Sequence, residues 1–398
     1  MIDDPENNNS DENKPEDNIE KHDPVEDESV ILTPTPSDAT FIDVKAEEDK
    51  KDSEVSVSIL KKRWKKFKTI KRGYYSFLII LFAYLISFAL PLLINRNALI
   101  VHYNGQNYYP VFNFYSSETF GQDIPGEANY RLLNEQFKQQ DGDNWVLMPL
   151  YPYGPNENLL DEIEGYPPTA PDWKHFCGTD NRGRDVFARL MYGFNISISF
   201  AIVVSALSYL IGVLLGAILG YYAGKVDIIG QRMIEIWSTL PFFYLIIIIS
   251  SIVQPNFIIL AVILTLFGWM SITYYIRGEF YREKSREYVQ AAVSMGAKNR
   301  VIILKHVLPN SLVPIISFLP FAIVANINSL VALDYLGFGL PPPTPSWGEL
   351  MNQGLSDITK WWLLTTPVAS LFLTLLAIVF IGEAIREAFD PKVYSRLR

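Results

Sequence analysis

The segment that decides the architecture is EYVQAAVSMGAKNRVIILKHVLPN, residues 287–310. It is rich in polar side chains, and long stretches without any charged residue lie on both sides of it. Glu287 favours a helix start, because the N-terminal end of a helix carries partial positive charge. Gly296 is expected to end that helix, since glycine adopts the left-handed conformation of a helix C-terminus. The sequence therefore predicts a short polar helix between two apolar spans.

The residue spacing of this helix predicts which side chains face a partner. Tyr288, Ala292 and Met295 follow one another at i, i+4 and i+7, so they are expected to share one face. The small side chains at 291 and 292 would let another surface approach the backbone. Pro309 suits the first turn of the following helix, because proline has no backbone N–H to donate. We interpret the segment as a docking helix, and an ordinary loop between two spans is the alternative.

The charge-free stretches predict six membrane-spanning helices, because a helix needs about 20 apolar residues to cross a bilayer. Residues 236–276 are too long for one span, and the turn signal Val253-Gln254-Pro255-Asn256 divides them into two. The six spans are expected at residues 74–94, 196–223, 236–276 (two helices), 307–333 and 361–382. The fold class predicted from the residues is therefore an all-α polytopic membrane protein.

The distribution of Lys and Arg predicts the orientation, because cytoplasmic segments carry an excess of these residues. Residues 61–72 hold eight Lys and Arg before the first span, and residues 277–305 hold seven. Residues 95–195 hold 13 Asp and Glu against seven Lys and Arg. We therefore expect a multi-pass protein of the cell membrane with both termini in the cytoplasm. A nucleic-acid partner is not expected, since the basic run directly precedes a span.

Composition divides the chain into further segments. Residues 1–60 hold 19 Asp and Glu against five Lys and Arg, with little apolar material to bury, which favours disorder. The aromatic segment after the first span predicts a small extracytoplasmic cap with short strands. Val186, Leu190 and Phe194 predict a short amphipathic helix that leads into the second span. The predicted segments are an acidic tail (1–59), a basic juxtamembrane segment (60–73), helix 1 (74–94), the cap (95–193), the core (194–386) with its docking loop (278–310), and the C-terminus (387–398).

The sequence lacks the residues that several classes of protein require. No GxxxxGK[ST] loop is present, so the chain is not expected to bind nucleotide itself. Cys177 is the single cysteine, and the four histidines lie outside the predicted spans, which disfavours a metal site or a membrane-embedded enzyme. Asp334 and Glu235 are expected to be end-of-helix groups. The alternative function is a six-helix secondary carrier or channel that works without ATP. The predicted spans hold few ionisable residues, whereas an ion-coupled carrier usually holds several.

The docking segment resembles the cytoplasmic EAA loop of ABC-importer permeases. That motif reads Glu-Ala-Ala, three residues, Gly, nine residues, Ile, one residue, Leu-Pro. Gln290 replaces the glutamate of the motif, and His306 replaces its isoleucine. The matching positions here are Gln290, Ala291, Ala292, Gly296, His306, Leu308 and Pro309.

Three further motifs extend the resemblance to the C-type permease subunit of oligopeptide and dipeptide importers. They are CGTDNRGRDVFARLMYG (177–193), GYYAGKVDIIGQRMIEIWSTLP (220–241) and DYLGFGLPPPTPSWGELM (334–351). The phrases VQPNF, FGWMS and IGEAIREAFDP are similar to the microcin-C-type branch of these permeases. The similarity covers about residues 61–391, and the acidic tail lies outside it.

The resemblance implies a type I ABC importer permease fold and a set of partners. It implies that the chain forms half of a peptide pore in a heterodimer with a sister permease, within the lipid bilayer. Two cytoplasmic ATPase subunits would use ATP and Mg²⁺, and an extracytoplasmic binding protein would deliver peptide. The chain itself would carry no catalytic site, cofactor or metal. The residues expected to dock the ATPase are Glu287, Tyr288, Gln290, Ala291, Ala292, Met295, Gly296, Leu308 and Pro309.

Overall fold

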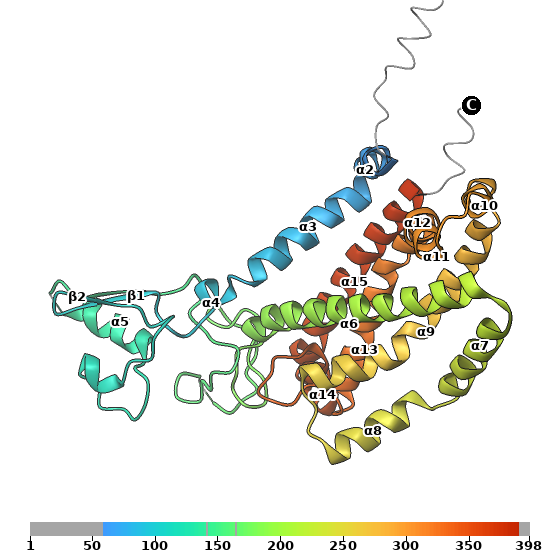
Figure 1. Cartoon of the computed structure of the whole chain (residues 1–398). Coiled ribbons are helices and arrows are strands. Elements are labelled where there is room, and N and C mark those ends of the chain that lie inside the picture. Colours follow the sequence, from blue (N-terminus) through green and yellow to red (C-terminus); the bar gives the residue numbers. More distant parts are fainter. Residues whose placement is uncertain (1–58, 141, 164, 390–398) are drawn as a thin grey trace, which may run out of the picture. The chain divides into compact units, whose positions relative to one another are not determined.

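Helices dominate the computed structural model, which describes residues 59–140, 142–163 and 165–389 (Figure 1). The acidic tail predicted for residues 1–59 lies outside the described residues except for Ile59, and so do residues 390–398 of the predicted C-terminus. The N-terminal helices are α2 (Ile59–Thr69), α3 (Lys71–Ser87) and α4 (Leu90–Leu93). The long helices that follow the cap are α6 (Val186–Tyr222), α7 (Gly224–Ser238), α8 (Phe242–Ile252), α9 (Phe257–Lys284), α13 (Leu319–Tyr335), α14 (Trp347–Ser356) and α15 (Trp361–Phe389).

Three helices, α6, α9 and α15, are long and apolar enough to cross a membrane, as judged by length and composition. Two bent pairs, α2 with α3 (99°) and α7 with α8 (64°), raise the number to five if each pair is one span. Helix α13 is apolar but has only 17 residues. The predicted apolar segments are therefore helical, while the count of six spans stays a prediction.

The predicted break near residue 255 is present. Helix α8 ends at Ile252, and the Asn256 side chain accepts a hydrogen bond from the Ile259 N–H at 2.9 Å to begin α9. The prediction for the preceding span was wrong in detail, because residues 224–238 already form α7 and a break follows before Pro241. Proline restricts the residue before it to extended conformations, so the helical path changes direction there.

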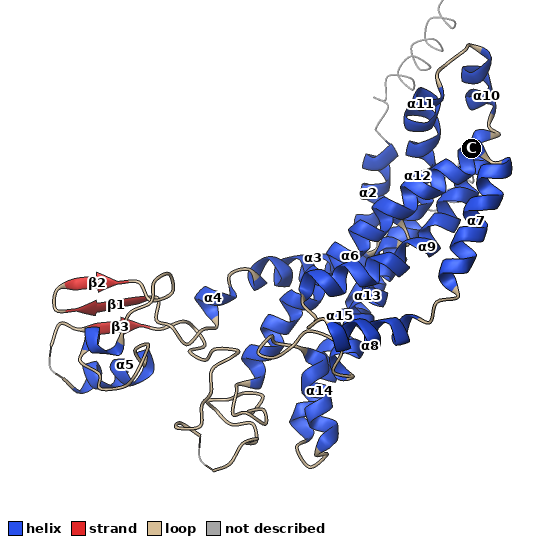
Figure 2. Ribbon diagram, turned by 60° about the horizontal axis from the view of Figure 1, so that its bottom comes forward, coloured by secondary structure: helices blue, strands red, loops and turns tan. Residues whose placement is uncertain are grey.

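The chain between α4 and α6 forms a three-stranded antiparallel sheet, and short strands were predicted for this aromatic segment (Figure 2). The strand order is β2 (Gln106–Tyr108), β1 (Ile100–Tyr103), β3 (Trp145–Leu147), and Val101 of β1 pairs with Tyr108 and Val146. The 3₁₀-helix η1 (Ser117–Phe120) and α5 (Tyr130–Gln139) complete this part. Its core is aromatic, with Phe120 and Tyr130 buried among their neighbours. The extracytoplasmic position of residues 95–193 stays a prediction.

The short amphipathic helix predicted around Val186, Leu190 and Phe194 is wrong. These residues belong to the first turns of the continuous 37-residue helix α6. The Asp185 side chain caps that helix by accepting a hydrogen bond from the Ala188 N–H at 2.8 Å. Val186 and Leu190 are buried against α14 and α15 rather than lying at an interface with lipid.

A buried ionic cluster holds the first turns of α6 against α14. Arg184 lies 2.6 Å from a carboxylate oxygen of Asp180 and 3.0 Å from one of Glu349 on α14. The fully buried Arg189 also donates to Glu349. The indole N–H of Trp347 donates to the Leu190 carbonyl at 3.0 Å. These contacts join two segments that are far apart in sequence.

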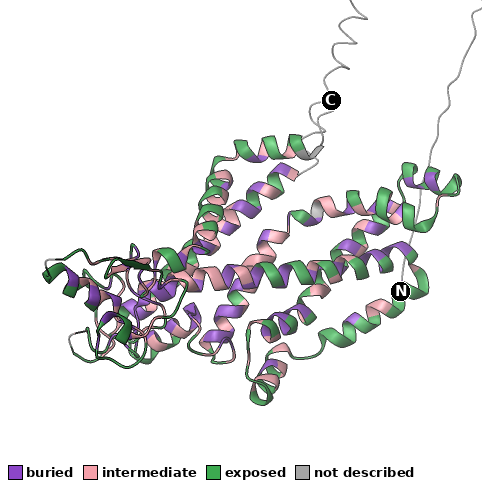
Figure 3. Ribbon diagram, turned by 60° about the vertical axis from the view of Figure 1, so that its left-hand side comes forward, coloured by how far each residue is buried: buried purple, intermediate pink, exposed green. Residues whose placement is uncertain are grey.

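Helices α6 and α9 pack closely along a row of glycines on α6. A Cβ atom placed on Gly212, Gly216 or Gly220 would lie 1.8, 2.7 or 2.6 Å from side-chain atoms of residues 272, 276 and 280 of α9. Small residues let helices approach in lipid, where no hydrophobic force drives them together. Burial is concentrated between the helices, and many of their outward side chains are exposed (Figure 3).

We predict that Gly216→Leu destabilises this contact. The added side chain has no room beside Ile276, and overpacking of this kind typically costs about 1–3 kcal/mol. The thermal unfolding midpoint of the detergent-solubilised chain should fall. Gly278→Leu is the matched control, since its Cβ would meet no atom within 4 Å. Equal midpoints for the two variants would show that the α6–α9 contact is not this close.

Candidate functional site: the loop between α9 and α12

The predicted docking helix is α10 (Glu287–Ser294), which starts at the residue expected from the sequence. It is followed by α11 (Asn299–Val301), the π-helix η2 (Ile302–Val307) and α12 (Leu308–Ile316). Helix α10 lies at one end of the helical bundle, and α14 lies at the other (Figures 1 and 2). The loop thus folds into helices of its own at one end of the bundle.

Glycine 296 ends α10 in the way that its residue type predicts. Its φ is +76°, which a side chain with a Cβ atom rarely adopts. The Gly296 N–H donates to the Val293 carbonyl at 2.9 Å, and the Ala297 N–H donates to the Ala292 carbonyl at 3.1 Å. This pair of hydrogen bonds is the Schellman arrangement of helix C-termini. It fixes the direction in which the chain leaves the helix.

The buried face of α10 differs from the predicted docking face. Val289 and Ala292 are buried, at 0% and 3% exposure, among side chains that include Phe280, Ile302 and Val307. Met295, by contrast, is 81% exposed. The predicted common face of Tyr288, Ala292 and Met295 is therefore wrong. Residue 292 packs against the chain itself, because α9 and η2 supply an apolar surface that the spacing alone does not reveal.

Small and apolar residues are exposed along the second half of α10 and at its C-terminal end. Ala291, Ser294 and Gly296 are exposed, and Val293 is 48% exposed. Together with Met295 they form a surface that we call the α10 outer face (Ala291, Val293, Ser294, Met295 and Gly296). Val293 and Met295 are the larger apolar side chains of this face, and both are in contact with solvent.

Tyr288 joins α10 to the ends of α9 and α12. Its hydroxyl lies 2.8 Å from a carboxylate oxygen of Glu283 and accepts a hydrogen bond from the Asn310 amide, also at 2.8 Å. Burial and the neighbouring Glu283 carboxylate raise the pKa of Tyr288, so the phenol stays protonated. The same Asn310 amide donates to the His306 carbonyl at 3.1 Å. Tyr288 therefore ties the loop together, and its side chain is still 43% exposed.

Gln290, which replaces the glutamate of the EAA motif, forms a hydrogen bond within the chain. Its amide donates to the Lys284 carbonyl at 2.8 Å. The Lys284 ammonium in turn donates to the Tyr221 carbonyl at 2.6 Å, and the Tyr221 hydroxyl donates to Asn299 at 2.9 Å. These bonds link α10 and α11 to the C-terminal end of α6.

An ion pair that sequence reasoning missed braces α7 on α9. The guanidinium of Arg277 donates to both carboxylate oxygens of Asp227, at 2.5 and 2.8 Å. The Tyr281 hydroxyl donates to the same carboxylate at 2.5 Å. Arg277 and Tyr281 are four residues apart on α9, so the spacing could have indicated a shared polar partner. The partner itself lies far away in sequence and carries no such signal.

Pro309 lies in the first turn of α12, as its residue type predicts, but α12 directly continues the helical turns before it. The helical path starts ten residues earlier, at Asn299 of α11, and passes through the π-helix before it reaches Leu308 and Pro309. Proline in an α-helix would collide with the carbonyl four residues before it. The wider π turn of residues 302–307 directly precedes the proline. Pro309 is exposed, and Leu308 is half-buried below α10.

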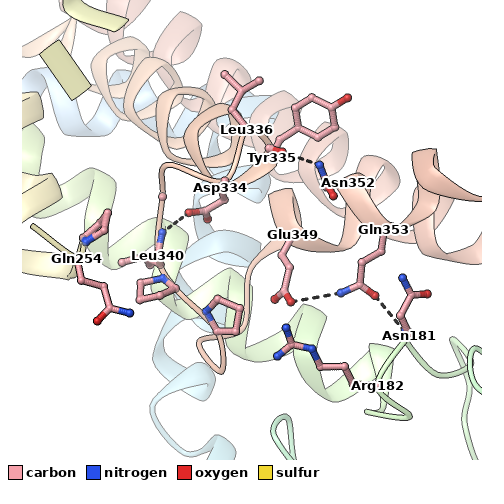
Figure 4. A pocket seen from close by; sticks show the side chains of 15 residues that line it. Asn181, Arg182, Gln254, Asp334, Tyr335, Leu336, Leu340, Glu349, Asn352 and Gln353 are labelled. Carbon is pink, nitrogen blue, oxygen red and sulfur yellow. Dashed lines mark hydrogen bonds between the residues drawn. The ribbon is translucent and has the colours of Figure 1, made fainter. Parts of the chain in front are cut away.

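A polar cavity of about 550 Å³ lies at the opposite end of the bundle (Figure 4). Gln353 of α14 donates to Glu349 and accepts from the Asn181 N–H, at 3.3 and 3.1 Å. Asp334 accepts from the Leu340 N–H at 2.7 Å and from the Ser346 hydroxyl, so it is the end-of-helix group that the sequence predicts. Both carboxylates in the cavity wall already have partners within the chain.

The side chains around α10 form hydrogen bonds and ion pairs within the chain. Among the described residues no group of three or more His, Cys, Asp or Glu side chains is placed to hold a metal ion. The carboxylates next to α10 are paired, as Glu283 is with Arg286 at 3.6 Å.

Comparisons with known proteins define the class to which the chain belongs. Residues 212–395 match the family described as binding-protein-dependent transport system inner membrane component. The chain is 42% identical over 330 residues to the inner membrane ABC transporter permease protein YejE of Escherichia coli, covering 83% of this chain and 96% of that protein. The chain therefore belongs to the binding-protein-dependent transport system inner membrane components, the permease subunits of ABC importers.

Other relatives place the chain within that family. It is 36% identical over 356 residues to the peptidoglycan transport system permease protein YejE of Agrobacterium fabrum, covering 83% of this chain and 93% of that protein. It is 36% identical over 232 residues to the dipeptide transport system permease protein DppC of Bacillus subtilis, covering 58% of this chain and 72% of that protein. The resemblance to peptide-importer permeases is thereby confirmed. A chain of the MetNI methionine ABC transporter matches with a TM-score of 0.43 and 17% identity, covering 51% of this chain and 96% of that chain.

We predict that Gly296→Val opens the end of α10 while Gly296→Asn leaves it closed. A β-branched residue is strained at a positive φ, at a cost of about 1–2 kcal/mol, whereas asparagine tolerates it. Amide hydrogen exchange in residues 292–297 should be roughly tenfold faster in the valine variant. Identical exchange in both variants would contradict a left-handed cap at this position.

Proposed function

We propose that the chain is the transmembrane half of a peptide importer and that the α10 outer face is where a cytoplasmic ATPase subunit docks. The single observation that carries this proposal is the two-sided environment of α10. One side, with Val289 and Ala292, is buried in the chain, and the other presents small and apolar residues to solvent. A partner seated on the outer face would press on a helix that is already fixed to the bundle.

The contacts of α10 suggest how such a movement would reach the membrane. Val289 and Ala292 pack on side chains of α9 and η2, and Tyr288 is hydrogen-bonded to Asn310 of α12. Gln290 bonds to the end of α9, which Lys284 connects to α6. A displacement of α10 would therefore act on three helices at once. ATP-driven closure of the ATPases would shift the pore between inward-open and outward-open states.

The proposed assembly contains a sister permease, two ATPase subunits and an extracytoplasmic binding protein. The six spans predicted from the sequence would be too few to enclose a peptide path and still shield its polar lining from lipid. A second, non-identical permease would supply the remaining wall. ATP and Mg²⁺ would be used by the ATPase subunits, and this chain would bind no cofactor.

The proposed orientation places both termini and α10 in the cytoplasm. It is supported by the excess of Lys and Arg in residues 61–72 and 277–305 and by the acidic balance of residues 95–195. The substrate class is peptides or peptide-like compounds, because relatives are named for dipeptide and peptidoglycan transport. Membership of an ABC-importer family favours this function over a secondary carrier or channel.

We predict that Ala291→Glu weakens ATPase docking while α10 stays folded. The residue is exposed on the outer face, so a new carboxylate meets solvent in the free chain but becomes an unpaired charge in the complex. Such a charge should weaken binding by about 2 kcal/mol or more, roughly 30-fold. The measurement is co-purification of the ATPase subunits with the membrane-inserted permease, with Ala291→Ser as the matched control.

A second variant separates docking from folding. Ala292→Glu buries its charge inside the chain, so it should increase hydrogen exchange throughout α10 as well as lose the ATPase. Ala291→Glu should leave that exchange unchanged. If Ala291→Glu co-purifies with ATPase at the wild-type yield, the α10 outer face is not the docking surface.

Reconstitution in liposomes tests the whole proposal. We expect the purified chain alone to show neither ATP turnover nor peptide uptake. Addition of the sister permease and the ATPases should give basal turnover, which the peptide-loaded binding protein should raise, because it favours the state in which the ATPases close. Uptake of labelled peptide by the single chain without ATP would instead support the carrier.

A further inference from the structure

A strongly basic surface outside the docking loop belongs to α2. Its sequence is ILKKRWKKFKT, with six Lys and Arg and no acidic residue. Lys61, Lys65 and Lys68 repeat at i, i+4 and i+7, so they lie along one face of the helix. Docking of an ATPase at α10 gives this surface no role, because α2 packs on α15 rather than on the loop.

The bend between α2 and α3 determines how this surface lies against a membrane. The two helices meet at 99°, and α3 continues as an apolar helix whose Leu78, Ile79 and Phe82 side chains are exposed. A helix perpendicular to an inserted helix runs along the bilayer surface. Leu78 lies seven residues beyond Lys71, or roughly 10 Å at the helical rise. The lysines of α2 are therefore close to the depth at which the apolar contact begins.

One side of α2 is fixed to the protein. Phe67 is buried against Ala384 and Ala388 near the end of α15, and the Lys66 ammonium donates to the Glu387 carbonyl at 2.9 Å. The guanidinium of Arg63 lies 4.9 Å from the centre of the Phe389 ring. These contacts set the rotation of α2 about its own axis, so the side that remains outward is defined.

The outward side carries cations without acidic partners. Lys61, Lys62, Lys65 and Lys68 are exposed, and none of them forms an ion pair within the described residues. Arg72, at the start of α3, pairs with Glu383 of α15 at 3.2 Å. Trp64 is 46% exposed on the same helix and stacks on Phe67, with ring centres 5.3 Å apart. Exposed Trp beside Lys is typical of segments at the membrane–water interface.

We propose that the outward side of α2 is a binding surface for the anionic headgroups of phospholipids. Four uncompensated ammonium groups, an interfacial aromatic ring and a right-angled turn into an apolar helix match a negatively charged bilayer surface. The surface anchors α2, and through Phe67 and Lys66 it steadies the end of α15. A soluble acidic protein is a poorer match, because the exposed apolar side chains of α3 begin directly beside the lysines.

The test places a reporter on α2 in the full-length chain. The single Cys177 is changed to Ser, Thr69→Cys receives a fluorophore, and the protein is reconstituted in phosphatidylcholine nanodiscs with a minor fraction of phosphatidylglycerol. Nitroxide-labelled phosphatidylglycerol or nitroxide-labelled phosphatidylcholine is then added in equal amounts as quencher. The ratio of the two quenching efficiencies reports which headgroup gathers at α2.

The matched variants keep or remove the charge at the same positions. Lys61, Lys62, Lys65 and Lys68 are changed together to Gln in one variant and to Arg in the other. In the wild-type and Arg proteins we expect labelled phosphatidylglycerol to quench at least about twice as strongly as labelled phosphatidylcholine. Each basic residue near an anionic bilayer surface strengthens binding to that surface roughly fivefold. High salt should reduce the ratio. In the Gln protein the ratio should fall to about one, with quenching by phosphatidylcholine retained.

Three outcomes would overturn the proposal. Equal quenching by the two lipids in the wild-type protein would show that α2 does not select anionic headgroups. A preference that persists in the Gln variant would assign it to another part of the chain. Absence of quenching by either lipid would place α2 away from the bilayer.

Discussion

The close contact between α6 and α9 is the constraint on which the rest of the structure depends. Lipid gives helices no hydrophobic reason to associate, so the gain must come from dense packing. The glycines at 212, 216 and 220 provide it, because each is opposite a large residue of α9 and leaves no space for a Cβ atom. Helix α6 begins in the ionic cluster with α14, and α9 ends beside α10. The two ends of the bundle are therefore joined through one helix pair.

The contact continues into the loop through polar bonds rather than through glycine. Beyond Gly220, the backbone and hydroxyl groups of Tyr221 bond to Lys284 and Asn299, and Arg277 fixes α7 through Asp227. In the proposed coupling, a movement of α10 cannot be absorbed by the loop alone, since these bonds would have to break. The apolar contacts of Val289 and Ala292 act in the same direction. Helices α6, α9 and α12 would then respond as one body to the ATPase.

Local signals allowed much of this to be predicted, and tertiary neighbours explain the rest. Glu287, Asn256 and Gly296 have a residue-level reason to begin or end a helix, and the structure places the boundaries there. The face of α10 was predicted wrongly because its burial depends on Phe280 and Ile302, which no spacing within α10 encodes. The sequence also did not predict that the helix through Val186 continues into the span. The residue that caps it, Asp185, lies in a segment whose sequence is typical of a turn. The partner of Arg277 lies 50 residues away in sequence and could not be inferred from one chain.

The two ends of the bundle use opposite chemistry, and this difference bears on which end accepts a mobile partner. At the α14 end, Arg189 and Asp180 are fully buried and are held with Arg184 and Glu349 in one cluster. Separation of such groups leaves a charge without a partner in a region of low dielectric, which is strongly unfavourable. That end therefore resists a local rearrangement. At the α10 end the residues of the α10 outer face are uncharged, so a partner could bind there and leave without stranding a charge. In the proposed mechanism this asymmetry matters, because a movement that begins at α10 would have to carry the first turns of α6 with it instead of loosening them.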